Sequence, residues 1–145
     1  MKTFIFIIVA TLFTNVYSFA QESYTKDATQ LPAPARTFID RHFPGQGISY
    51  IMIDKEMTNT EYEVVLTNHQ EITFNKNGEW KEIDGKRNPL PKSVIPNEAS
   101  SYLQSNFRDT GVKEIERKFW GYEINLMNGL EIKLDSQGRL LEIDD

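Results

Sequence analysis

The chain of 145 residues contains no cysteine. This absence excludes disulfides, thiolate metal sites, a cysteine nucleophile and a lipid-modified N-terminal cysteine. Histidine is nearly absent too, because only His42 and His69 occur, and they lack the HExxH spacing of a zinc protease. There is no GxSxG motif either, so no nucleophile with a positioned base is visible. We therefore predict a protein that is not an enzyme and that has no cofactor and no metal centre.

Positive charge is also in short supply. Lysine and arginine number 16 against 21 aspartates and glutamates, which gives a formal net charge of −5. Nucleic acid and anionic membrane surfaces both select a basic protein surface, so neither is a predicted partner. A basic protein outside the cytoplasm, or a cation, fits the charge better.

The chain has only one long hydrophobic run, FIFIIVATLF over residues 4–13. It is too short to cross a bilayer, which takes about 20 apolar residues. It follows a lysine and precedes Ser18-Phe19-Ala20, an arrangement typical of a secretory signal peptide. We predict a signal peptide over residues 1–20 that is cleaved after Ala20, no membrane insertion after cleavage, and a periplasmic or secreted protein. Residues 21–30 are polar and aperiodic, which predicts a flexible leader.

The rest of the sequence contains an internal repeat. Residues 31–51 resemble residues 95–115, and residues 62–84 resemble residues 122–144. The second pair of segments shares Tyr62-Glu63 with Tyr122-Glu123, Glu71-Ile72 with Glu131-Ile132, and Glu82-Ile83-Asp84 with Glu142-Ile143-Asp144. We predict one repeat over residues 31–84, a linker over 85–94 and a second repeat over 95–145, the two forming one domain.

Each repeat begins with a helical pattern and continues with strand patterns. Leu31, Ala35, Phe38, Ile39 and Phe43 recur at the spacing of one helical face. Alternating apolar and polar residues then predict four short strands per repeat, and Asn128-Gly129 is a strong signal for a tight hairpin. The predicted fold is α+β: a tandem repeat of a helix plus a four-stranded antiparallel meander, with two helices on one face of a roughly eight-stranded sheet.

These patterns resemble a known family. The residues that carry the resemblance are Leu31 to Gly45, Tyr62 to Asp84, Ile95 to Phe107 and Tyr122 to Asp144. They are similar to the PepSY-like, beta-lactamase-inhibitor-protein-like secreted proteins that are common in Bacteroidetes. The resemblance implies the same fold and brings no catalytic motif. For function the resemblance implies little; the family name borrows from an inhibitor that grips an enzyme with the open face of a sheet.

Strand parity indicates which residues face away from the helices. The candidate partner-binding residues are outward-facing glutamates together with apolar residues at strands and one turn: Tyr50, Met52, Glu63, Glu71, Glu114, Glu116, Phe119, Trp120, Glu123 and Glu131. An ordinary solvated sheet face is the simpler explanation of the glutamates, and Trp120 could equally fold back on the sheet edge instead of being exposed. The leading interpretation is a non-enzymatic, protein-binding or inhibitor-like module. The alternative is a periplasmic protein that binds or senses a small ligand or a cation such as Ca²⁺.

Other polar features have simpler explanations. We expect His42 to pack on the apolar helix face and His69 to be exposed in a hairpin turn. Asn75 to Glu79 and Asp135 to Gly138 are rich in side-chain oxygen, but they lack the acids that a calcium loop needs at fixed positions. We interpret both as turns.

Overall fold

The computed structural model describes residues 20–145, and the predicted signal peptide lies outside them except for Ala20. The described chain is α+β, with two helices, two 3₁₀ turns and a nine-stranded antiparallel sheet. In chain order the elements of the first half are β1 (Gln21–Thr25), η1 (Ala28–Gln30), α1 (Ala33–His42), β2 (Ile48–Lys55), β3 (Thr60–Leu66), β4 (Glu71–Phe74) and β5 (Trp80–Asp84). Those of the second half are η2 (Lys92–Val94), α2 (Asn97–Asn106), β6 (Val112–Lys118), β7 (Gly121–Leu126), β8 (Glu131–Asp135) and β9 (Leu140–Asp144).

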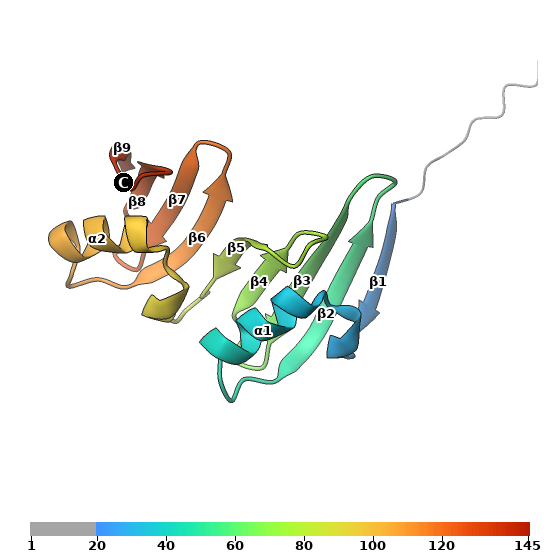
Figure 1. The fold of residues 1–145 in the computed structure, drawn as a ribbon. Helices are drawn as coiled ribbons and strands as arrows, with labels where there is room; N and C mark the ends of the chain where they lie inside the picture. The colour runs from blue at the N-terminus through green and yellow to red at the C-terminus, as the bar shows by residue number, and fades with distance from the viewer. Residues whose placement is uncertain (1–19) are drawn as a thin grey trace, which may run out of the picture.

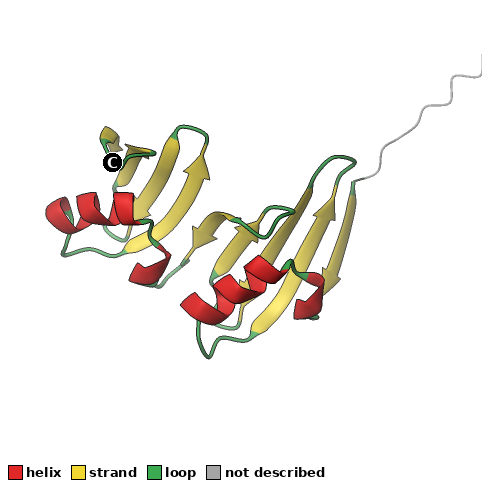
Figure 2. Cartoon of the chain, viewed as in Figure 1, coloured by secondary structure: helices red, strands yellow, loops and turns green. Residues whose placement is uncertain are grey.

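The strands form a simple meander, because their order across the sheet is their order in the chain. Figure 1 shows both helices on the same side of this sheet, α1 over the first half and α2 over the second. Figure 2 shows β5 as the strand that joins the two halves. There Glu82 to Asp84 pair with Glu114 to Glu116, so a ladder of three residue pairs connects them.

Tight turns set the register of the hairpins. In both β3–β4 and β7–β8 an asparagine side chain accepts a hydrogen bond from the backbone two residues on, at 3.1 Å. The next residue takes a positive φ, 70° at His69 and 95° at Gly129. The asparagines themselves do not have a positive φ, so each loop has three residues and ends in a left-handed residue, and it is not the two-residue type I′ turn that Asn128-Gly129 predicts. The hairpins themselves are present where the sequence predicts them.

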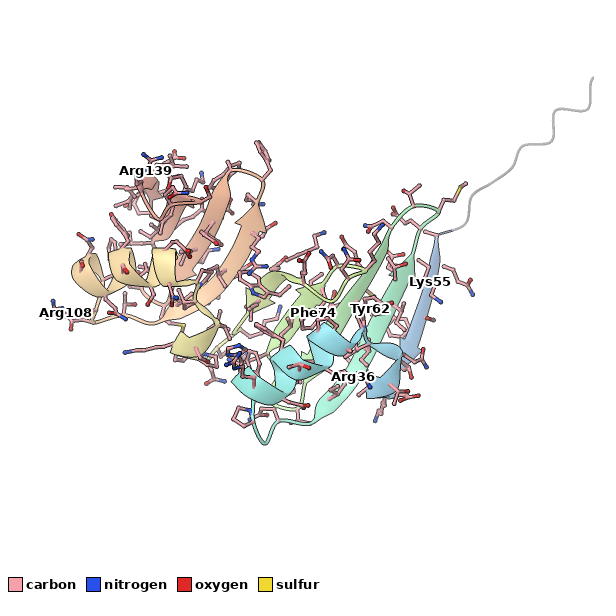
Figure 3. The ribbon with its side chains drawn as sticks, in the orientation of Figure 1. Arg36, Lys55, Tyr62, Phe74, Arg108 and Arg139 are labelled. Carbon is pink, nitrogen blue, oxygen red and sulfur yellow. The ribbon has the colours of Figure 1, made fainter. Side chains whose placement is uncertain are left out.

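The core lies between the helices and the sheet. Each helix contributes one alanine and one larger apolar residue that are buried, Ala35 with Ile39 and Ala99 with Leu103. The small alanines let the helices approach the strands closely. Phe74, fully buried on β4, meets Phe38 of α1 edge-on at 5.8 Å between ring centroids. Tyr62 packs against the same core, and both strand residues are labelled in Figure 3.

Two sequence predictions are corrected here. Residues 21–25 are not part of a flexible leader: they form β1 and pair with β2 from Gln21–Lys55 to Thr25–Ile51. The sheet consequently has nine strands instead of about eight. The polar composition of β1 misled the prediction, because an edge strand with four of its five residues exposed has no apolar stripe to reveal it.

Candidate partner-binding surface

We call the side of the sheet opposite the helices the open face. Because side chains alternate along a strand, the pairing register shows which residues share it. One row crosses the sheet through Tyr24, Met52, Glu63, Thr73, Glu82, Glu116, Glu123, Lys133 and Glu142. The neighbouring row runs through Tyr50, Val65, Glu71, Asp84, Glu114, Asn125, Glu131 and Asp144. Acidic side chains dominate both rows.

Lysines neutralise this surface only in places. Lys86 bridges Glu71 at 2.6 Å and Asp84 at 2.7 Å, and these contacts outweigh its desolvation and raise its pKa. Lys133 lies within 3.5 Å of Glu131, Glu142 and Asp144. The remaining contacts on this side are Lys81 with Glu61 and Lys118 with Glu116.

Glu82 lies at the middle of the surface and has no lysine partner among the described ion pairs. It pairs across the β5–β6 seam with Glu116, which in turn pairs with Glu123 on β7. Partial burial, a hydrogen bond with Glu114 and repulsion from neighbouring carboxylates raise the pKa of Glu82 to about 7. The sheet therefore holds a carboxyl group that is partly protonated near neutral pH.

Glu82 lines a hollow that extends from β2 to β6. Its volume is about 260 Å³, and its lining is mostly acidic: Met52, Asp54, Glu61, Glu63, Thr73, Lys81, Glu82 and Glu116. Burial, then repulsion by Glu71, raises the pKa of Glu63. The hollow thus combines two glutamates that are poorly compensated.

Aromatic and apolar side chains flank the acidic rows. Tyr24 and Tyr50 lie 6.1 Å apart between ring centroids, and Met52 pairs with Tyr24 on the same face. In the turn that joins β6 and β7, Phe119 is fully exposed, at 102 % of its reference area. Trp120 beside it is half-buried. Exposed aromatics next to a charged region are typical of protein interfaces.

The structure gathers eight of the predicted partner-binding residues on one face. These are Tyr50, Met52, Glu63, Glu71, Glu114, Glu116, Glu123 and Glu131, while Phe119 and Trp120 lie at a turn beside it. Sequence reasoning missed Glu82, Asp84, Glu142 and Asp144. The reason is that bulges interrupt the pairing after Thr73 and after Lys133. Strict alternation assigns the wrong side to the residues beyond each bulge, because the helix-facing residues of β5 and β9 are three positions apart instead of two.

The other polar residues lie where the sequence predicts them, in the helix face and in turns. His42 is half-buried, its Nδ1 lies 2.9 Å from the Ser93 hydroxyl, and desolvation lowers its pKa. His69 is exposed in the β3–β4 turn. Asn75 and Asp135 use their side-chain oxygens to accept backbone N–H groups of their own turns, at 2.9–3.0 Å. Within residues 20–145 no group of three or more histidine, aspartate or glutamate residues is arranged to hold a metal ion.

The chain belongs to a known family. Residues 60–142 match the family described as "Putative beta-lactamase-inhibitor-like, PepSY-like", and the chain is a member of it. The resemblance seen in the sequence is therefore confirmed. No curated protein gives a match.

Solved structures agree with this assignment. The chain is 38 % identical, with a TM-score of 0.79, to a "putative periplasmic protein of unknown function" from Bacteroides vulgatus ATCC 8482, over 86 % of this chain and 100 % of that one. A second protein of that organism, from the DUF2874 family, is 33 % identical over 86 % and 97 % of the two chains, with a TM-score of 0.80. A "putative calcium-regulated periplasmic protein" from Bacteroides thetaiotaomicron is 32 % identical over the same shares, with a TM-score of 0.79.

These neighbours also address the location of the protein. All three are described as periplasmic, which agrees with the predicted export. No described helix is long and apolar enough to cross a membrane. The protein acts outside the cytoplasm, in the periplasm or beyond it.

Proposed function

We propose that this protein is a non-enzymatic binding module that holds a basic protein partner on its open face. The observation that carries the proposal is the row of three glutamates, Glu82, Glu116 and Glu123, directly opposite one another on adjacent strands. Like charges in cross-strand pairs destabilise a sheet. Their retention beside a hollow and exposed aromatics is explained if lysines or arginines of a partner neutralise them on binding.

The two-repeat organisation supports the same conclusion. We propose that the halves are copies of one unit, and this places Glu63 equivalent to Glu123 and Glu71 equivalent to Glu131. All four residues face the same side. A repeated acidic surface on a continuous sheet suits an extended basic partner better than a small ligand. Its field would accelerate association and make the affinity depend on salt.

Glu82 supplies a signature of this mode of binding. A partner cation beside it would lower its raised pKa and release a proton. Binding should therefore strengthen as the pH rises from about 5 to about 8. Glu82→Gln should remove that part of the pH dependence, which isothermal titration in buffers of different ionisation enthalpy would measure.

The main test is affinity capture with residues 21–145 as bait. Wild-type protein and a Glu63→Lys/Glu123→Lys/Glu131→Lys variant are exposed to native envelope and secreted extract, and retained proteins are identified by mass spectrometry. An Asp40→Lys/Glu98→Lys/Asp109→Lys variant is the matched control, because it makes the same charge change at exposed residues of the helical side. We expect one protein to be retained by wild type and control and lost by the open-face variant.

Equal retention by both variants would overturn the open-face proposal. Trp120→Ala tests the adjoining turn in the same experiment. If the turn takes part in binding, the variant should lose most of the retained protein while its melting temperature stays close to that of wild type.

Calcium binding is the second candidate, because one structural neighbour is described as calcium-regulated. Binding on the acidic open face would have to bring its carboxylates together, because no group of three within residues 20–145 is arranged to hold a metal ion. Calorimetric titration of the mature protein with Ca²⁺ tests it directly, with Mg²⁺ as the control ion. Heat of binding and a rise in melting temperature that are specific to Ca²⁺ would support it, and their absence would remove it.

A further inference from the structure

The last strand of the described chain, β9, has an outer edge that differs from its equivalent in the first half. The equivalent strand is β5, since Trp80 and Ile83 stand where Leu140 and Ile143 stand in the second half. Trp80 and Ile83 are 6 % and 0 % exposed, whereas Leu140 and Ile143 are 44 % and 42 % exposed. Leu141, at the bulge, is 56 % exposed, and the first half has a lysine there. An exposed row of this kind on an edge strand invites pairing.

The first half shows what covers such an edge. β6 pairs with β5 and places Ile115 directly opposite Ile83. Two residues further on, the Arg117 guanidinium carbon lies 3.8 Å from the centre of the Trp80 ring. Among residues 20–145 no strand takes the corresponding place beside β9. By analogy with β6, a strand that paired with β9 would carry two large side chains, at alternate positions, on the helical side.

The backbone of β9 is oriented to accept that strand. In the first half the Gly85 N–H donates to the Lys113 carbonyl across the β5–β6 seam, at 2.7 Å. Hydrogen bonding alternates along an antiparallel pair, so Ile83 also turns its N–H and C=O toward β6. In the second half the Leu126 N–H donates to the Leu130 carbonyl at 2.8 Å. Following the alternation from this pair along β7, β8 and β9 shows that the N–H and C=O of Ile143 point away from β8.

The charges near this edge select the occupant. Glu142 and Asp144 are 53 % and 52 % exposed at their side chains, and Lys133 is their described cationic contact. A second copy of this chain, paired through β9 about Ile143, would set Glu142 of each chain opposite Asp144 of the other. Like charges opposed in this way are unfavourable. The other edge strand, β1, carries Gln21, Ser23 and Thr25 on the helical side, and these would not cover Leu140 and Ile143.

We propose that β9 is a docking edge for an extended segment of a partner protein, which adds as a tenth strand. The segment carries apolar side chains at the alternate positions that cover Leu140 and Ile143. It carries lysine or arginine at the positions between them, which lie opposite Glu142 and Asp144. Backbone hydrogen bonds supply affinity and the alternating side chains supply specificity. The edge shares Glu142 and Asp144 with the open face, but the proposal does not depend on a partner binding to the rest of that face.

The probes are two peptides copied from residues 111–119, which contain β6. Both carry Arg117→Leu, because Arg117 covers Trp80 in the first half whereas the corresponding residue of β9 is Leu140. One also has Glu114→Lys and Glu116→Lys; the other keeps the glutamates as the matched control. Binding to the mature protein is measured by fluorescence anisotropy. We expect the lysine peptide to bind at least tenfold more tightly than the glutamate peptide.

Two substitutions in the protein locate the binding. Ile143→Pro removes the outward N–H at a position where an edge strand tolerates proline, and should weaken binding of the lysine peptide at least tenfold. Ile143→Ala keeps the N–H and should weaken it about threefold. A Glu63→Lys/Glu116→Lys variant changes the open face on β3 and β6, neither of which pairs with β8 or β9, and should bind the peptide nearly as well as wild type.

Hydrogen exchange in the wild-type protein gives a readout that does not depend on the folding of any variant. Addition of the lysine peptide should slow exchange of the Ile143 amide at least tenfold. Unchanged exchange there would overturn the proposal. So would binding that Glu63→Lys/Glu116→Lys abolishes and Ile143→Pro leaves intact, because the peptide would then lie on the open face. A concentration-dependent dimer in sedimentation that Ile143→Pro abolishes would identify a second copy as the occupant and would also overturn it.

Discussion

From the 3₁₀ turn onward the two halves of this molecule have the same order of elements, while β1 belongs to the first half alone among the described residues. Within the shared elements we compare the strand that closes each half. β5 lies between β4 and β6, so its apolar residues are buried and its outward carboxylates face other carboxylates. β9 pairs with β8 only among the described strands, and its equivalent residues are exposed. Nearly the same local sequence therefore gives a core strand in one half and an edge strand in the other. The neighbouring strand decides which.

Equivalent glutamates make the contrast sharper. Glu82 and Glu142 occupy corresponding positions, yet the pKa of Glu82 is raised to about 7 and the pKa of Glu142 is lowered. Glu142 accepts a hydrogen bond from Lys133 at 2.9 Å. The residue that pairs with Glu82 at the same place is Thr73. A different cross-strand partner and one added strand thus give opposite pKa shifts at two positions that correspond in strand pairing.

The largest expected effect compares the apolar residues of the two closing strands. Ile83→Ala should cost about 3 kcal/mol, because Ile83 is fully buried and its loss leaves a cavity. Ile143→Ala should cost about 1 kcal/mol, since solvent already reaches that side chain. Urea unfolding of both variants measures the difference. Equal costs would show that the exposure of β9 is not maintained in solution.

The next comparison is between two glycine turns, one packed against α2 and one in open space. Gly138 has a φ of +80°, and a Cβ there would overlap the backbone carbonyl of Glu98 at the start of α2. Gly138→Ala should cost about 2 kcal/mol, from unfavourable φ and this overlap together. Gly129→Ala is the control, because Gly129 has a φ of +95° but open space around it. It should cost about 1 kcal/mol by thermal unfolding, and an equal loss in both variants would argue against close packing of the turn on α2.

A smaller effect follows from the pKa of Glu82. Its folded pKa of about 7 lies above the ordinary value of 4.5, so the folded state binds a proton that the unfolded state releases. This contribution stabilises the protein fully below pH 4.5 and is lost as the pH rises through about 7. Glu82→Gln should match wild type at pH 4.5 and be more stable at pH 8 by roughly 1 kcal/mol, after allowance for solvent screening. Urea unfolding at both pH values checks this, and a constant difference would contradict it.

The last comparison exchanges one residue between the two halves and changes a pKa, with little expected effect on the fold. Thr73→Lys gives the first half the equivalent of Lys133 and should lower the pKa of Glu82 by at least about one unit. Lys133→Thr makes the reverse change and should raise the pKa of Glu142 toward its ordinary value. Carboxyl chemical shifts followed by NMR against pH measure both. No movement of Glu82 in the first variant would mean that burial alone sets its pKa.

Several elements were predictable because their signals are local. The helices followed from apolar spacing, and the β7–β8 hairpin followed from Asn128-Gly129. Strand alternation also placed Glu63, Glu71, Glu123 and Glu131 on one face. Other features have no local signal. β1 is polar and is recognisable only by its pairing with β2, and the bulges that turn Glu82 and Glu142 outward depend on neighbouring strands.

The sequence by itself determined the predicted export, the α+β class, the family and the acidic character of one face, because composition, periodicity and turn residues act over short distances. The tertiary structure alone decided which closing strand is buried, which glutamate titrates near neutral pH and how far the sheet extends. These properties depend on residues brought together across strands. The burial of Ile83 against Ile115 is set by a strand that lies about thirty residues further along the chain.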